Sequence, residues 1–189
     1  MIKLIVGLGN PGERYQKTRH NAGFWLLEAL AERAGETFRA ESKFSALMAR
    51  VSIAHYGVYL AKPQTFMNAS GRTVAALAHF YQIEPENILV VHDELDLPEG
   101  VVKLKLGGGH GGHNGLRDII KALDSKDFYR LRLGIGHPGD KSQVIDYVLH
   151  PPGKEGLLAI EQAIKHGLDI LPVLLRDGAE KAMHQLHSS

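Results

Sequence analysis

Two short apolar runs constrain the fold of this chain more than any other feature. Residues 2–8 are almost entirely apolar and lead into Gly9, and residues 87–94 (NILVVHDE) repeat the pattern with acidic residues at the carboxyl end. Runs of this length are typical of strands buried on both faces of a sheet, as in parallel sheets covered by helices. Because parallel strands end at the same edge of a sheet, we expect the residues after the two runs to lie close together.

The remaining sequence alternates between helical and strand patterns. Residues 21–35 show helical spacing with Asn21 as the expected N-cap, and the expected inner face is Phe24, Leu27, Leu30, Ala31 and Ala34. Further helices are predicted at 69–82, at 114–124 and in the C-terminal third, where Pro172 interrupts the longest. Further strands are predicted at 46–53, 57–62, 101–106 and 130–135. This order predicts one α/β domain over residues 1–189 with a mixed sheet.

Composition excludes several classes of protein. With 44% hydrophobic and 23% charged residues, the chain is a folded protein and not a disordered one. It contains no cysteine, which excludes disulfides, thiolate catalysis and cysteine-ligated zinc and fits a reducing compartment. No apolar run is long enough to span a bilayer. The net charge of +1 means that any surface for nucleic acid must be a local patch.

Residues 7–12 match the G-x-G-x-x-G pattern of dinucleotide-binding folds, directly after the first apolar run. The context differs from that fold, because Pro11 and a polar loop to His20 precede the next helix. No acidic residue ends a second strand about 20 residues further on, where the fold requires one. A tight strand exit, or a turn that presents the Asn10 amide at the sheet edge, are the better interpretations.

Residues 107–115 (GGGHGGHNG) are the most biased stretch, since six of the nine are glycine. Glycine permits positive φ and lets a ligand approach the backbone closely. The loop leads into the predicted helix 114–124, whose free N–H groups favour an anion or a polarised carbonyl. The stretch is therefore a candidate binding loop.

A metal site is one alternative for the same loop. His110 and His113 have H-x-x-H spacing and follow Asp93, Glu94 and Asp96 in the sequence. Two histidines in a glycine loop are not held on one helical face, unlike those of an H-E-x-x-H helix. Ordinary loop polarity and hydrogen bonding is the simpler interpretation.

His20 is the leading candidate for a general base, because imidazole titrates near neutral pH. Asp93 ends the second apolar run, at the sheet edge that residues 2–8 share, and a carboxylate on one ring nitrogen fixes the tautomer of a histidine. A structural histidine and a turn aspartate remain the alternatives. The chain has neither a G-x-S-x-G elbow nor a cysteine, which leaves water activated by His20 as the simplest hydrolytic chemistry.

Two strictly alternating strands predict a local basic surface. Their apolar residues are Val102, Leu104, Leu106, Leu131, Leu133 and Ile135, and the residues between them include Lys103, Lys105, Arg130 and Arg132. If the strands are neighbours, the four cations line one surface that suits phosphate groups. A solvated sheet face is the alternative.

Five sequence blocks together resemble the bacterial-type peptidyl-tRNA hydrolases: GLGNPGERYQKTRHNAG, FMNASG, HDELDLPEG, GGGHGGHNGL and RLGIGHPG. The resemblance covers residues 3 to about 150, and the tail beyond is weakly diagnostic. It implies a single α/β domain with a twisted mixed sheet. It also implies an enzyme that hydrolyses the ester between a peptide and the terminal ribose of tRNA, with no metal or other cofactor.

The resemblance also assigns residues. It implies that His20 is the catalytic base, oriented by Asp93. Asn10, Asn68 and Asn114 would hold the peptide and the ester, and Asn10 would favour blocked over free aminoacyl substrates. Tyr15 and Phe66 match positions that contact the tRNA end, and Lys105 and Arg132 match a phosphate clamp. The expected protein is a cytoplasmic monomer that binds no membrane. A non-catalytic RNA-binding module and a nucleotide-dependent enzyme remain the alternatives.

Overall fold

Four parallel strands form the centre of the structure, and two of them are the strands that the apolar runs predicted. The computed structural model describes residues 1–188 and contains a mixed sheet with the strand order β2-β3-β4-β1-β5-β7-β6. The strands are β1 (Leu4–Gly7), β2 (Arg39–Glu41), β3 (Ala46–Ile53), β4 (Tyr56–Pro63), β5 (Ile88–Glu94), β6 (Val102–Leu106) and β7 (Tyr129–Gly134). Strands β4, β1, β5 and β7 are parallel to one another, whereas β2, β3 and β6 pair in antiparallel fashion.

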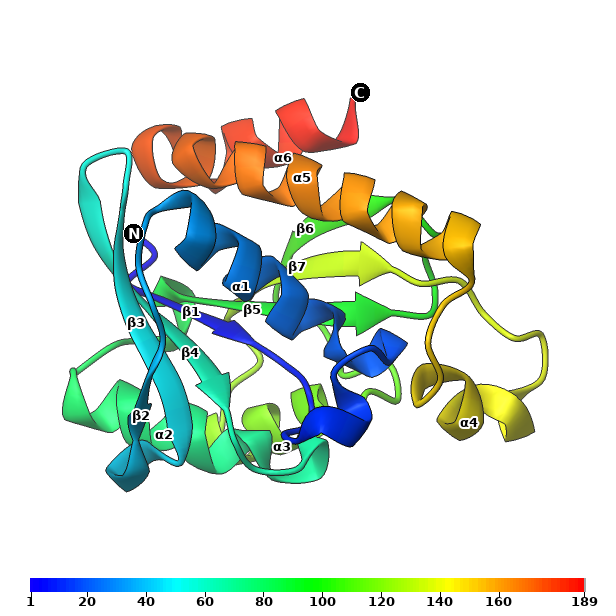
Figure 1. Cartoon of the computed structure of the whole chain (residues 1–189). Coiled ribbons are helices and arrows are strands. Elements are labelled where there is room, and N and C mark those ends of the chain that lie inside the picture. The colour runs from blue at the N-terminus through cyan, green and yellow to red at the C-terminus, as the bar shows by residue number, and fades with distance from the viewer. Residues whose placement is uncertain (189) are drawn as a thin grey trace.

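Helices cover both faces of the sheet (Figure 1). They are α1 (Ala22–Arg33), α2 (Ser70–Phe80), α3 (Asn114–Leu123), α4 (Val144–Val148), α5 (Lys154–Asp177) and α6 (Ala179–His187). Helices α1, α5 and α6 lie on one face, α2 and α3 lie on the other, and α4 lies beside one edge (Figure 1). Among residues 1–188, no helix is both long enough and apolar enough to cross a membrane.

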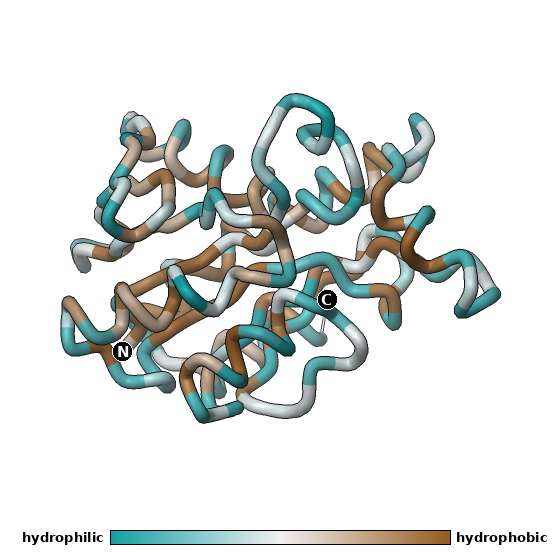
Figure 2. The backbone as a smooth tube through the Cα atoms, turned by 90° about the horizontal axis from the view of Figure 1, so that it is seen from below, coloured by the Kyte–Doolittle hydropathy of each residue, from teal (hydrophilic) through white to brown (hydrophobic). Residues whose placement is uncertain are grey.

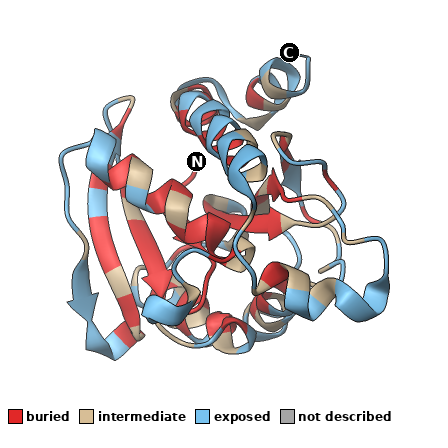
Figure 3. Ribbon diagram, turned by 45° about the vertical axis from the view of Figure 1, so that its right-hand side comes forward, coloured by how far each residue is buried: buried red, intermediate tan, exposed pale blue. Residues whose placement is uncertain are grey.

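The central strands are buried on both faces, which explains their unbroken apolar character (Figure 3). In β1, Ile5 belongs to the core beneath α1 and α5, whereas Leu4 and Val6 belong to the core beneath α2 and α3. Figure 2 shows the same concentration of hydrophobic residues in the middle of the molecule. The predicted α/β class with a mixed sheet is confirmed, and the sheet has an α-helical layer on each side.

The glycine pattern of residues 7–12 has a packing explanation. A Cβ atom on Gly7 would lie 2.5 Å from the Gly23 oxygen, and one on Gly9 would lie 2.8 Å from the Phe24 ring. A Cβ atom on Gly23 would lie 2.4 Å from the Val91 oxygen. These glycines therefore let the start of α1 lie directly against the ends of β1 and β5, in agreement with the interpretation as a tight strand exit.

Three local predictions were wrong. Pro172 does not interrupt the longest helix, because α5 continues through it. Burial of ten α5 residues outweighs the lost backbone hydrogen bond, a cost of about 3 kcal/mol. Ala34 follows the end of α1 and is exposed. Leu106 is 49% exposed because it lies at the end of an edge strand, beyond the helices.

The close approach of α1 to the sheet gives a stability prediction. Gly23→Ala should lower the free energy of unfolding by about 1–3 kcal/mol, because the added methyl group overlaps backbone atoms that cannot move independently. Urea unfolding followed by circular dichroism measures the change. The matched control is Gly109→Ala, an exposed position without positive φ, where a Cβ atom would meet nothing within 4 Å. Equal stability of both variants would show that α1 does not depend on this contact.

Candidate active site

The carboxyl ends of the parallel strands position the candidate site residues. Asn10 follows β1, and its backbone is held by the Asn21 side chain, which accepts from the Asn10 N–H and donates to the Asn10 oxygen, both at 2.9 Å. Asn21 is the N-cap residue of α1, as predicted, but its side chain makes no capping hydrogen bond because Asn10 takes both of its polar atoms. The Met67 N–H donates to Asn10 Oδ1 at 2.6 Å. The amide is thereby oriented with Nδ2 available to a ligand.

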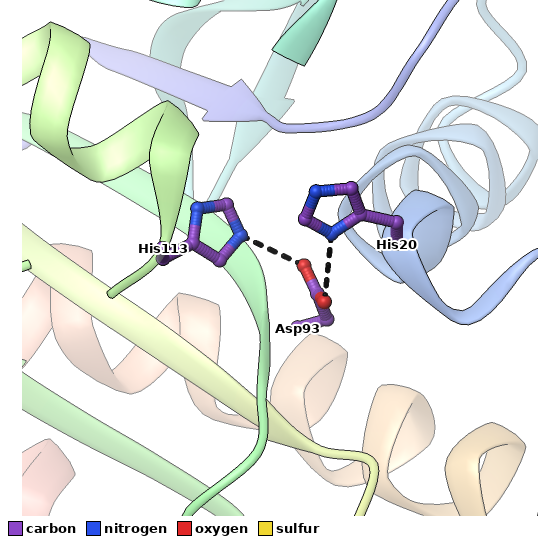
Figure 4. Close-up of side chains that lie close together, drawn as sticks. All are labelled: His20, Asp93 and His113. Carbon is purple, nitrogen blue, oxygen red and sulfur yellow. Dashed lines mark hydrogen bonds and ion pairs between the residues drawn. The ribbon is translucent and has the colours of Figure 1, made fainter. Parts of the chain in front are cut away.

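A buried carboxylate joins two histidines at the end of β5 (Figure 4). His20 Nδ1 lies 2.9 Å from Asp93 Oδ2, and His113 Nε2 lies 2.8 Å from Asp93 Oδ1. The Asp93 side chain is 2% exposed, and those of His20 and His113 are 12% and 10% exposed. His20 comes from the turn before α1 and His113 from the residue before α3, so the two rings reach Asp93 from opposite faces of the sheet. The predicted His20–Asp93 contact is confirmed.

The start of α3 fixes the tautomer of His113. The backbone N–H groups of Gly115 and Leu116 donate to His113 Nδ1 at 3.1 and 3.3 Å. Since Nδ1 is an acceptor, the ring proton is on Nε2 and is donated to Asp93. His20 donates its Nδ1 proton to the other oxygen, which leaves His20 Nε2 with a free lone pair. The two rings therefore differ, because only His20 can act as a base.

Electrostatics reinforce this assignment. Burial alone would raise the pKa of Asp93, but the charges and hydrogen bonds of His20 and His113 outweigh it and hold that pKa far below its usual range. Burial alone would lower the pKa of His20, but the charge of Asp93 and its hydrogen bond outweigh burial, so the pKa is raised above 6.5. A carboxylate that is always ionised thus makes His20 a stronger base.

The donor set does not fit a metal ion. His20, Asp93 and His113 place potential ligand atoms within 4.8 Å of one another. Coordination through His113 Nε2 would require a proton on Nδ1, where two backbone N–H groups already point. Within residues 1–188, His110 does not belong to this group, and its Nδ1 accepts the Gly112 N–H at 2.9 Å, which favours the interpretation as ordinary loop hydrogen bonding.

A cavity of about 260 Å³ adjoins this cluster. The predicted site residues that line it are Asn10, His20, Phe66, Asn68, Asp93 and Asn114. Tyr15 does not line it, but its ring packs edge-on against Phe66 with the centroids 6.2 Å apart. The cavity therefore has amide groups, a histidine base and an exposed aromatic rim within reach of one ligand.

The basic surface is only partly as predicted. Strands β6 and β7 are neighbours, and Lys103 faces Arg132 while Lys105 faces Arg130. Arg130 is 2% exposed and donates to the Gly108, Gly109 and Lys126 oxygens, so it is not a surface cation. Burial and the charge of Arg132 lower the pKa of Arg130 to about 10. Lys105 and Arg132 line a second cavity of about 290 Å³, where Arg132 pairs with Glu94 at 2.9 Å.

Sequence analysis missed the other wall of the main cavity. Val144, Ile145, Val148 and Leu149 line it from α4 and the residue that follows. Arg19 holds this segment, because its Nη1 donates to the Tyr147 oxygen at 2.8 Å and its guanidinium lies 3.8 Å from the Tyr147 ring. The only signal in the sequence was the weak apolar pattern of a five-residue helix.

A histidine base oriented by a buried carboxylate, beside a cavity lined with amides at the carboxyl edge of an α/β sheet, is typical of an enzyme that hydrolyses an ester-like bond with water. Comparison with known proteins makes this class specific. Residues 4–189 match the family model of peptidyl-tRNA hydrolase, and the chain belongs to the peptidyl-tRNA hydrolase family. It is an enzyme that hydrolyses peptidyl-tRNA, and the resemblance of the five sequence blocks is confirmed.

Similar proteins agree over the whole length. The chain is 58% identical to peptidyl-tRNA hydrolase from Dichelobacter nodosus, with 100% of both chains covered. It is 53% identical to the enzyme from Nitrosomonas europaea, over 99% of this chain and 96% of that one. The crystal structure of peptidyl-tRNA hydrolase from Acinetobacter baumannii superimposes with a TM-score of 0.96 and 48% identity, over 99% of this chain and 95% of that one.

The balance of effects on His20 gives a titration prediction. In Asp93→Asn, the two effects that raise the pKa of His20 are lost while burial persists, so this pKa should fall from above 6.5 to below it. NMR titration of the His20 ring measures both values. Asp96→Asn, which neutralises an exposed carboxylate three residues away, is the control and should leave the His20 pKa unchanged. An identical His20 titration in Asp93→Asn would contradict the electrostatic coupling.

Proposed function

We propose that His20 is the general base of peptidyl-tRNA hydrolysis and that Asp93 orients it. The observation that carries the proposal is the sharing of Asp93 between two rings of which only His20 keeps a free nitrogen in the cavity. His20 Nε2 takes a proton from water as the water oxygen attacks the ester carbonyl. When the tetrahedral intermediate breaks down, the ribose oxygen leaves and regains that proton from His20. The products are a free peptide carboxylate and tRNA with a free terminal hydroxyl.

Asn10, Asn68 and Asn114 bind the acyl part of the substrate in this proposal. All three line the cavity, and the Asn10 amide is held by its oxygen so that its N–H₂ group faces the ligand. Amide donors stabilise the negative charge that develops on the carbonyl oxygen. They also bind peptide backbone, which suits a substrate of any sequence. Asn10 would favour an N-blocked acyl group, since a neutral amide oxygen accepts its hydrogen bond.

The aromatic rim serves the tRNA part of the substrate, together with the second cavity, which Lys105 and Arg132 line. We call this second cavity the basic cavity. Phe66 is 60% exposed and packs against Tyr15, so this pair offers a surface to the terminal ribose or base. Lys105 and Arg132 form the phosphate clamp. The proposal, which follows the family resemblance, is of a monomeric enzyme in the cytoplasm, where the absence of cysteine fits a reducing environment.

The role of His20 is tested by His20→Ala. Hydrolysis of peptidyl-tRNA should fall by about 100- to 10,000-fold, the usual effect of removing a general base. Affinity for uncleaved substrate should change little, because the basic cavity lies elsewhere. Single-turnover rates and filter binding measure the two quantities. A variant with unchanged turnover would remove His20 from the mechanism, and equal losses of rate and affinity would indicate a disturbed structure instead.

The clamp is tested by substrate length. The double variant Lys105→Ala, Arg132→Ala should lose more kcat/KM on full-length peptidyl-tRNA than on a short peptidyl-nucleotide ester that cannot reach the clamp. Its plot of log affinity against log salt should be flatter by up to about 1 per lost contact. Lys121→Ala, an exposed cation on α3, is the control for loss of charge alone. If the ratio of the two kcat/KM values equals that of the wild type, the clamp assignment is wrong.

A further inference from the structure

A third cavity lies on the other side of Asn10 from the catalytic cluster. It has a volume of about 380 Å³ and is lined by the loop after β1, the first half of α1 and the end of β4. Asn10 lines both this cavity and the main one. None of the steps derived above uses it. We call it the Lys62 cavity, after its most unusual lining residue.

Lys62 is a buried cation with incomplete compensation. It is 9% exposed, and the Phe24 and Phe38 rings lie 5.7 and 4.3 Å from its Nζ atom. Its acidic partner is Glu28, whose carboxylate lies at 3.8 Å and is 53% exposed. That separation is beyond hydrogen-bond distance, so the pair is weak. Burial lowers the pKa of Lys62, and the charge of Glu28 offsets this only in part.

The other lining groups fit a nucleotide better than a simple anion. Lys17 adds a second cation, and Glu28 is the one acidic residue among those lining this cavity within residues 1–188. Trp25 contributes a flat ring, fixed by a hydrogen bond of 2.8 Å from its Nε1 atom to the Gln16 oxygen. Gln64 contributes a neutral polar group. Cations beside an aromatic face and an amide are the groups that bind single-stranded nucleic acid.

The position matches the substrate. Phe66 lines the main cavity and packs edge-on against Tyr15, while Gln16, next to Tyr15 in the chain, and Gln64, two residues before Phe66, line the Lys62 cavity. The Lys62 cavity therefore lies within reach of an RNA strand whose terminal ribose is at the rim. Lys105 and Arg132 line a different cavity, which shares no lining residue with this one.

We propose that the Lys62 cavity binds a phosphate group of the single-stranded 3′ end of the tRNA, one or two nucleotides before the ester, through Lys62 and Lys17. The inference rests on the proposed function, because it assigns that substrate a second phosphate site. Glu28 is the internal competitor for Lys62, and the incoming phosphate replaces it.

The test compares ligands that differ in phosphate content. The probes are adenosine, which has no phosphate, and the trinucleotide CCA without an acyl group, which has two internucleotide phosphates and no ester to hydrolyse. Fluorescence titration with the labelled trinucleotide gives affinities for wild type and variants. Lys62→Met, which preserves length and suits the aromatic surroundings, should weaken trinucleotide binding by about 10-fold and leave adenosine binding unchanged. Glu28→Gln should act in the opposite direction and strengthen it.

Two controls separate this site from the others. Lys154→Ala removes an exposed lysine at the start of α5 and should have no effect on trinucleotide binding. Lys105→Ala should weaken full-length tRNA but not the trinucleotide. Because binding is measured without cleavage, the result is independent of whether His20 is the base. Failure of the general-base assignment would show in the rates of His20→Ala alone.

Three results would overturn the proposal. The first is trinucleotide binding that is unchanged in Lys62→Met. The second is an equal loss of adenosine and trinucleotide binding in that variant, since this would mean that Lys62 only supports the structure. The third is weaker trinucleotide binding in Glu28→Gln, since this would mean that the Lys62–Glu28 ion pair supports binding and that Glu28 does not compete with phosphate.

Discussion

The site depends on one buried carboxylate. The Asp93 side chain is 2% exposed, and an ionised carboxylate is stable there only if each oxygen has a donor. His20 and His113 supply these donors from opposite faces of the sheet, one before α1 and one before α3. The end of β5 thereby fixes the starts of two helices relative to each other. The loop after β1 and the glycine loop are held together by a single negative charge.

The same carboxylate makes two chemically identical side chains different. The start of α3 occupies the second nitrogen of His113, whereas nothing comparable occupies that of His20 among residues 1–188. His113 is therefore a fixed donor, and His20 keeps a lone pair directed to the cavity. Asn10 is constrained in a similar way. The Asn21 side chain binds its backbone, and the Met67 N–H donates to its Oδ1 atom, which leaves its Nδ2 atom for a ligand. Backbone groups decide which atoms remain reactive.

Sequence patterns were sufficient where periodicity and strand direction decide the outcome. Parallel strands ending at one edge predicted the His20–Asp93 contact, and alternation predicted that β6 and β7 are strands. The patterns failed where a loop conformation decides. His113 reaches Asp93 because Gly111 and Gly112 adopt φ of 57° and 84°, which no periodicity reveals. Arg130 lies on the predicted face, but the same loop folds over it and supplies two of its carbonyl partners.

Glu94, the residue after Asp93, places a second carboxylate at the site, and its negative charge has to be neutralised. Glu94 lines both the main cavity and the basic cavity, so an unpaired carboxylate there would act on both. It would repel a polyanion from Lys105, which lines the same cavity. Its ion pair with Arg132 at 2.9 Å neutralises it, while the β5–β7 register holds Arg132 opposite His92, two residues before Glu94. Arg132 thus limits the effect of the Glu94 charge on both cavities. The main cavity is left with Asp93 and its two imidazoles, whereas Lys105 makes no ion pair within residues 1–188.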